Sequence, residues 1–138
     1  MPYFKDADEV YATLGALFVG LVEDAEMGPA LRAADAIVEY VYRRPDARVT
    51  CRLLAAEELR VDLGDSDLVP EVTLTMDADV GHRFWLGKVN PTFAVARGQI
   101  KTSGQLGKVM ALAPLVKPIV ARYRAQLEAM GRGDLLNV

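Results

Sequence analysis

The chain has 138 residues, of which 51% are hydrophobic, 25% charged and 7% aromatic, and its net charge is −3. This length and balance are those of one globular domain, so we expect residues 1–138 to form a single domain with its own core. The composition excludes collagen-like and low-complexity chains, and no run approaches the roughly 20 apolar residues of a membrane-spanning helix.

The chain has one cysteine, Cys51, and one histidine, His82. A lone cysteine cannot form an internal disulfide, and no leader pattern precedes Asp8, so we expect a cytoplasmic protein. The two residues lack the ligand spacings of a zinc site, so we expect no metal and no cofactor. We interpret Cys51 as a buried, inert thiol and His82 as an exposed residue on a helix.

The first quarter of the chain predicts a helix over about residues 6–26. Asp6 is a good N-cap, and Glu9, three residues later, can close a capping box. Apolar residues then recur at helical spacing until Gly28 and Pro29 end the pattern. A short helical turn follows over about residues 31–34.

The next stretch predicts four strands. Residues 36–43 are β-branched and aromatic, and apolar and polar residues alternate in three later segments, at 48–53, 58–63 and 72–76. Alternation with short connections is typical of an antiparallel meander with one face covered.

After Met76 the spacing becomes helical again. We expect a short helix that ends at Gly87, another from Asn90 to Gly98, and helical pieces over 104–112 and from Pro114 or Pro118 to 130. Residues 99–103 predict a fifth strand. The fold class is therefore α+β: a five-stranded, mostly antiparallel sheet with helices packed on one face.

No motif in the chain supports catalysis. Thr102 and Val109 stand where a phosphate-binding loop needs Gly and Ser or Thr, and the Rossmann and nucleophile-elbow patterns are absent. We therefore name no catalytic residue and expect no enzyme activity.

Charge is unevenly distributed along the chain. Residues 1–79 carry 7 Lys/Arg against 17 Asp/Glu, and residues 80–138 carry 9 against 2. The basic half lacks interleaved aromatic residues for base stacking, so we expect no nucleic-acid partner. Either the two halves neutralise each other in the fold, or the basic half meets an anionic partner.

Apolar side chains crowd the last third of the chain, on short segments that Gly and Pro interrupt. An ordinary core is one interpretation, and a ligand cavity between these helices and the sheet is the other. The candidate ligand-binding residues are Phe84, Trp85, Phe93, Ile100, Met110, Leu112, Val116 and Ile119.

A signature stretch runs from Gly87-Lys88-Val89-Asn90-Pro91 through Ala94-Val95, Gly98 and Gln99-Ile100-Lys101 to Gly104 and Gly107. Here the chain resembles the sterol carrier protein 2 (SCP2) domain family. The resemblance implies a five-stranded sheet whose helices enclose an apolar tunnel for a sterol, fatty acyl or phospholipid ligand, without a cofactor or metal. Thr102 departs from the aliphatic residue usual in the family, which implies a more polar or narrower pocket there.

Two functions from different classes remain open. The first is a non-enzymatic lipid-binding or carrier domain, whose basic half contacts an anionic headgroup or membrane. The alternative is an accessory module on the same fold that forms a homodimer or docks to a lipid- or quinone-handling enzyme. A filled interior and a large apolar patch on the 115–130 helix would favour the alternative.

Overall fold

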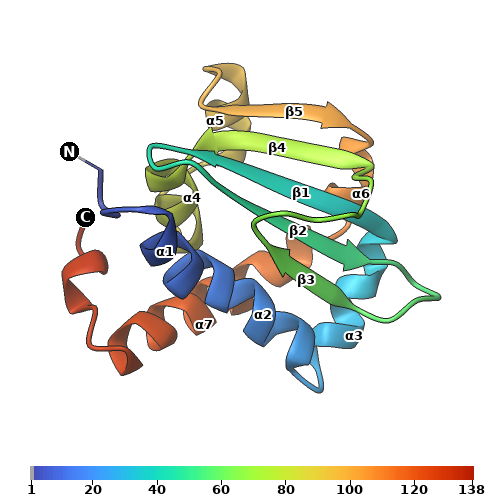
Figure 1. The fold of residues 1–138 in the computed structure, drawn as a ribbon, viewed down its shortest axis with the longest axis horizontal. Coiled ribbons are helices and arrows are strands. Elements are labelled where there is room, and N and C mark those ends of the chain that lie inside the picture. The colour runs from blue at the N-terminus through green and yellow to red at the C-terminus, as the bar shows by residue number, and fades with distance from the viewer. Residues whose placement is uncertain (1) are drawn as a thin grey trace.

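The computed structural model describes residues 2–138 and has a five-stranded sheet with its long helices on one face (Figure 1). The strands are β1 Ala36–Arg43, β2 Ala47–Leu53, β3 Arg60–Leu63, β4 Val72–Asp77 and β5 Ile100–Gly104. The α-helices are α1 Ala7–Val10, α2 Ala16–Glu23, α3 Met27–Leu31, α4 Ala78–Trp85, α5 Pro91–Ala96, α6 Leu106–Met110 and α7 Val116–Ala129. The π turn η1 Tyr11–Gly15 joins α1 to α2, and the 3₁₀ turns are η2 Arg32–Ala34, η3 Ala113–Leu115 and η4 Gly133–Leu135.

The strand order is β3-β2-β1-β4-β5, and every neighbouring pair is antiparallel except β1 and β4, which are parallel. The predicted fold class is confirmed, but the predicted four-strand meander is wrong in its last step. Residues 64–71 carry the chain past β2 and β1, so that β4 pairs with the far edge of β1 and not with β3 (Figure 1). Alternating polarity specifies which face of a strand is buried but not which strand lies beside it.

The N-terminal helix forms as predicted, with a π turn in its middle. Asp6 caps it by accepting a hydrogen bond from the Glu9 amide at 3.0 Å. A capping box would also have the Asp6 amide donate to the Glu9 carboxylate. In the structure the Lys5 amide donates to this carboxylate instead. Gln126 of α7 donates to the Thr13 carbonyl at 2.9 Å and thereby ties the two long helical segments together.

One end of the layer between the sheet and the helices is densely packed. We call it the packed end and define it by residues that are each at most 2% exposed: Phe4, Val10, Leu14, His82, Tyr123, Leu127 and Leu135. The predicted exposure of His82 is wrong, because α4 contacts both the sheet and α7. Its Nδ1 lies 2.8 Å from the Tyr123 hydroxyl and its Nε2 lies 2.8 Å from the Leu135 carbonyl oxygen. With both ring nitrogens bonded, a histidine is stable in a core.

Candidate functional site

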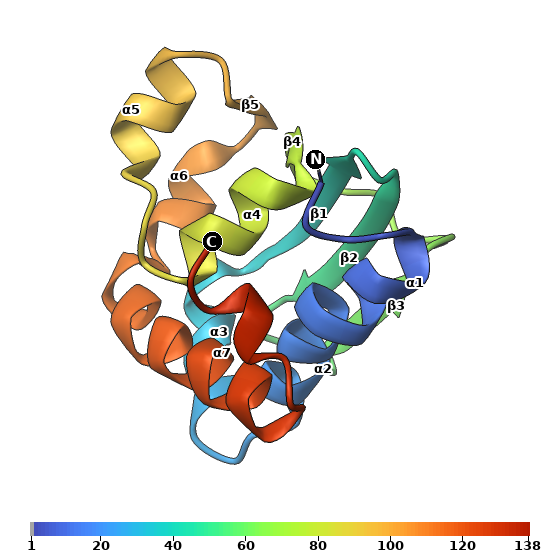
Figure 2. The ribbon, with the colours of Figure 1, turned by 90° about the vertical axis from the view of Figure 1, so that its left-hand side faces the viewer.

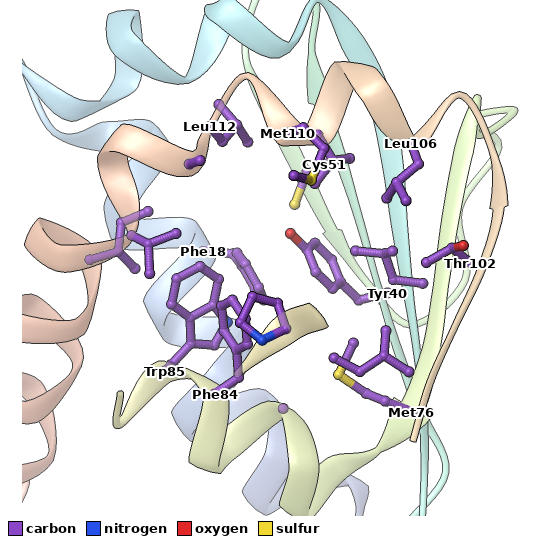
Figure 3. A pocket seen from close by; sticks show the side chains of 18 of the residues that line it. Phe18, Tyr40, Cys51, Met76, Phe84, Trp85, Thr102, Leu106, Met110 and Leu112 are labelled. Carbon is purple, nitrogen blue, oxygen red and sulfur yellow. The ribbon is translucent and has the colours of Figure 1, made fainter. Parts of the chain in front are cut away.

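The other end of the same layer holds a cavity of about 390 Å³ between the inner face of the sheet and α2, α4, α5, α6 and α7 (Figure 3). This volume lies within the roughly 300–1,000 Å³ of small-molecule sites. The wall has no Asp, Glu, His, Lys or Arg side chain. It consists of Phe18, Leu21, Val22, Leu31, Tyr40, Tyr42, Cys51, Leu53, Leu74, Met76, Gly81, Phe84, Trp85, Pro91, Thr92, Val95, Ile100, Thr102, Leu106, Val109, Met110, Leu112, Ala113, Val116 and Ile119.

The pleat of the sheet builds the floor of the cavity. Successive side chains of a strand point to opposite faces, so alternate residues of neighbouring strands form rows across one face. The register places Tyr40 beside Leu74 and Leu74 beside Thr102. The next row is formed by Tyr42, Met76 and Ile100.

Helix α4 supplies the aromatic wall. Phe84 and Trp85 meet edge to face, with ring centroids 4.7 Å apart, and both line the cavity (Figure 3). Gly81 lets α4 lie close to β1, because a Cβ at this position would come within 2.8 Å of the Tyr42 ring. The glycine therefore sets how near the aromatic wall stands to the floor.

The mouth of the cavity lies between α5 and the α6–η3 segment. The lining residues with high exposure all belong to these elements: Pro91, Thr92, Val95, Met110 and Ala113. The lining residues of the strands and of α4 are buried or half-buried. Figure 2 shows α5 and α6 on one side of α4, with α1 and α2 on the other.

Short helices leave this mouth open. The Asn90 side chain caps α5 by accepting from the amides of Thr92 and Phe93, and Gly98 ends the helix at a φ of +75°. Gly104, at a φ of +88°, turns the chain from β5 into α6, and a Cβ there would lie 2.1 Å from the Glu71 carbonyl oxygen. Segments of six and five residues cannot cover the face that a long helix would cover.

A smaller groove adjoins the cavity beside α7. It shares Phe84, Pro91 and Val116 with the cavity wall, and Lys117 lies at its edge. Lys117 is exposed and forms no ion pair with any residue from 2 to 138. The groove therefore places a cationic side chain next to an apolar cavity.

The titratable groups of the cavity wall are the phenol groups of Tyr40 and Tyr42 and the thiol of Cys51, and all three stay protonated. Burial raises the pKa of both Tyr40 and Tyr42, and it raises the pKa of the Cys51 thiol to about 12. Cys51 is buried, as predicted, and its high pKa makes it a poor nucleophile. Thr102 lines the cavity at the position where the sequence implied a more polar wall.

The structure brings together seven of the eight predicted site residues. Phe84, Trp85, Ile100, Met110, Leu112, Val116 and Ile119 line the cavity. Phe93 is not among the lining residues and is 62% exposed. Whether the seven contact a ligand stays a prediction.

Sequence reasoning missed the part of the wall that comes from the first half of the chain, above all Phe18, Tyr40 and Cys51. Tyr40 and Cys51 occupy alternate positions of their strands that share a face with apolar neighbours. This alternation was the signal that could have predicted their place on the inner face of the sheet. Pattern alone places such residues on the inner face but does not distinguish a core from a cavity wall.

Charge neutralisation between the two halves is partial. Ion pairs join Lys108 to Glu71, Arg122 to Asp24 and Arg132 to Glu9, at 3.2, 3.0 and 3.1 Å. The sequence has no Asp or Glu from residue 80 to 127. The basic and apolar side chains exposed around the mouth form what we call the rim: Phe93, Val95, Arg97, Met110 and Lys117.

A model of the SCP-2 sterol transfer family matches residues 18–117. The chain belongs to this family. The match contains all five strands and every cavity-lining residue except Ile119. The family resemblance of the signature stretch is thereby confirmed, and a search of curated protein sequences gave no match.

Solved SCP2 domains share the fold. The sterol carrier protein domain 2 of Helicoverpa armigera has 20% identity and a TM-score of 0.67, over 88% of this chain and 95% of that one. Palmitated SCP2L2 from Aedes aegypti has 18% identity and a TM-score of 0.58, over 78% and 93%. The UbiJ-SCP2 ubiquinone synthesis protein has 14% identity and a TM-score of 0.54, over 76% and 90%.

Two features are absent from residues 2–138. No helix in this range is long and apolar enough to cross a membrane. Nor does the range contain a group of three or more His, Cys, Asp or Glu side chains placed to hold a metal ion.

Proposed function

We propose that the chain binds a lipid in the cavity between its sheet and its short helices and carries it without chemical conversion. The observation that carries this proposal is the apolar, uncharged wall around a space of about 390 Å³. Burial of ligand hydrocarbon supplies the affinity, at about 0.8 kcal/mol per methylene, so ten methylenes contribute on the order of 8 kcal/mol before the cost of association.

The ligand classes that suit this wall are fatty acyl, phospholipid, isoprenoid and sterol-like lipids. The palmitated form of the Aedes aegypti neighbour supports an acyl chain as one occupant. The absence of a charged side chain among the lining residues supports a carrier over an enzyme, since general acid–base and nucleophilic catalysis need a group that titrates or is activated in the site. The cytoplasmic location stays a prediction.

The rim supports transient contact with an anionic membrane. Phe93, Val95 and Met110 are 62%, 41% and 62% exposed, and Arg97 and Lys117 stand among them. The Arg97 guanidinium lies 5.8 Å from the centre of the Phe93 ring, so a cationic and an apolar side chain lie next to each other on the rim. Apolar side chains beside unpaired cations suit the interface of an anionic bilayer.

An accessory module is the second candidate. The likeness to a ubiquinone synthesis protein favours it, and the rim would then contact a lipid- or quinone-handling enzyme or a second copy of the chain. Two features argue against it as the sole function. The interior is not filled, and of the large hydrophobic residues from 115 to 130 only Met130 is exposed.

The test is to close the mouth. Ala113 lines the cavity, is exposed and precedes Pro114, so Ala113→Trp places a large side chain at the entrance without removing core atoms. We expect at least a tenfold weaker affinity for a fluorescent long-chain fatty acid. Val69→Trp, at a 78% exposed position outside the cavity, is the matched control and should bind like the unsubstituted protein. Equal affinity in the unsubstituted protein and both variants would mean that the fatty acid does not bind in this cavity.

A further inference from the structure

We propose that Met110 is an oxidation site at the mouth of the cavity, where hydrogen peroxide converts its thioether to a sulfoxide and thereby weakens lipid binding. A bound lipid covers the thioether, so oxidation inactivates the ligand-free form of the protein. This inference rests on the proposed function and adds a reversible control to it. It starts from the sulfur-containing side chains of the cavity wall, which are Cys51, Met76 and Met110.

Met110 differs from the other two sulfur residues of the wall in its exposure. It is 62% exposed, whereas Met76 is 7% and Cys51 is 2% exposed. Figure 3 shows Met110 on the α6 side of the cavity, across from Phe84 and Trp85 of α4. A peroxide in water therefore reaches Met110 before it reaches either of the other two sulfur atoms.

A thioether reacts with a peroxide without first losing a proton. The sulfur lone pair attacks one peroxide oxygen, the O–O bond breaks, and the sulfur–oxygen bond of the sulfoxide forms. The displaced hydroxide takes up the proton of the transferred oxygen and leaves as water, so methionine loses two electrons and hydrogen peroxide gains them. A cysteine reacts as its thiolate, and burial raises the pKa of the Cys51 thiol to about 12, so Cys51 resists peroxide at neutral pH.

The α6 backbone is held in place beside the mouth. Lys108 Nζ donates to the Asp35 carbonyl oxygen at 3.0 Å and lies 3.2 Å from a carboxylate oxygen of Glu71. The Gln105 amide, just before the helix, donates to the Glu71 carbonyl oxygen at 3.0 Å. Oxidation of Met110 therefore changes the polarity of the entrance and leaves the helix where it is.

The sulfoxide conflicts with a bound hydrocarbon chain. A sulfoxide oxygen needs water or another donor, and a lipid chain that packs against it displaces that water. If the side chain turns outward to keep its water, the lipid loses the apolar contact with Met110. Either arrangement lowers the affinity. Because the position is exposed, methionine sulfoxide reductases can reach the sulfoxide and restore the thioether.

Met130 is a second exposed methionine and lies outside the cavity wall. It is 42% exposed and follows the end of α7, and its sulfur accepts a hydrogen bond from Gln126 Nε2 at 3.7 Å. Its oxidation leaves the cavity unchanged. The chain therefore contains a matched control for Met110.

The test treats the protein with hydrogen peroxide and then removes the peroxide with catalase. Peptide mass spectrometry gives the sulfoxide content of each methionine, and the affinity for a fluorescent long-chain fatty acid is measured in the same samples. We expect conversion of Met110 to lower this affinity by at least about fivefold, and methionine sulfoxide reductases A and B together to restore it. Palmitate added before the peroxide should slow the conversion of Met110 by at least about threefold and leave that of Met130 unchanged.

Two variants assign the effect, each compared with itself before treatment. Met130→Leu should lose affinity like the unsubstituted protein, and Met110→Leu should lose less than about twofold. Full conversion of Met110 without loss of affinity, or an equal loss in Met110→Leu, would show that the inference is wrong while lipid binding stands. Conversion of Met130 at a peroxide concentration that leaves Met110 reduced would also overturn it, and equal conversion of Met110 with and without palmitate would contradict the protection by bound lipid. Untreated protein that does not bind the fluorescent fatty acid would contradict the proposed function itself.

Discussion

The two ends of the layer between sheet and helices differ although they share one sheet. At the packed end, Leu14 and Leu127 are fully buried, and His82 satisfies both ring nitrogens between α4, α7 and the C-terminal turn. At the cavity end, Leu106 and Met110 stand on a five-residue helix and leave a space of about 390 Å³. At the packed end the helices cover the sheet and form a core. At the cavity end, short helices between glycines and prolines leave part of the sheet uncovered and form a cavity.

The largest difference should appear in matched leucine truncations. Leu14→Ala removes side-chain atoms from the packed end and should lower the free energy of unfolding by about 3–5 kcal/mol. Leu106→Ala removes the same atoms from a wall that already faces a cavity and should cost about 1 kcal/mol or less. Urea unfolding of both variants measures the difference. Equal losses would mean that the cavity end is as densely packed as the other.

The histidine of the packed end should be the next most sensitive position. His82→Ala leaves the Leu135 carbonyl and the Tyr123 hydroxyl without their partner and opens a void, so we expect a loss of about 3 kcal/mol in unfolding free energy. The affinity for a fluorescent fatty acid, measured where the variant is folded, should stay within about twofold because His82 does not line the cavity. Intact stability in this variant would refute the role assigned to the buried network.

Acid should weaken the packed end through the same residue. Burial lowers the pKa of His82 below its ordinary value of 6.5. The unfolded chain therefore takes up a proton as the pH falls through about 6.5, while the folded chain resists protonation until lower pH. The unfolding free energy should be full above that pH and decline below it, by at most about 1.4 kcal/mol per pH unit. Urea unfolding at pH 7.5 and 5.5 measures the decline, and His82→Gln, which lacks the chain's one titrating imidazole, should reduce it.

The smallest expected effects concern the rim of the cavity end. Arg97→Gln and Lys117→Gln should each lower the affinity for phosphatidylserine-containing vesicles, measured by co-sedimentation, by about fivefold. The reason is that one cation near an anionic surface contributes about 1 kcal/mol. Lys5→Gln, near the packed end, serves as the control and should change nothing. Vesicle binding that ignores the rim substitutions would favour docking to a protein partner over a membrane.

The sequence predicted the elements well where local chemistry decides them. The Asp6 and Asn90 caps, the ends at Gly87 and Gly98, and Pro118 in the first turn of α7 are all found in the structure. The sequence-based prediction was wrong for strand pairing and for burial where these depend on contacts between residues far apart in the chain. The parallel pairing of β4 with β1 follows from the path of residues 64–71, and the burial of His82 follows from the position of α7.

The cavity wall was predictable in part for the same reason, and whether it binds a ligand stays a prediction. Residues of the last third were recognised because short, interrupted apolar helices are unusual for a core. Phe93 was misplaced because helical spacing does not tell which side of a six-residue helix faces inward. Tyr40 and Cys51 were missed as wall residues because a strand pattern looks alike over a core and over a cavity.

The central claim is that the cavity holds a lipid, and native mass spectrometry of protein purified gently from its source, without detergent, tests it most directly. The account predicts a population heavier than the bare chain by the mass of one lipid, which is released on collision and is absent or reduced in Ala113→Trp. Bare protein that also takes up no member of a panel of fatty acids, phospholipids, isoprenoids and sterols would contradict it.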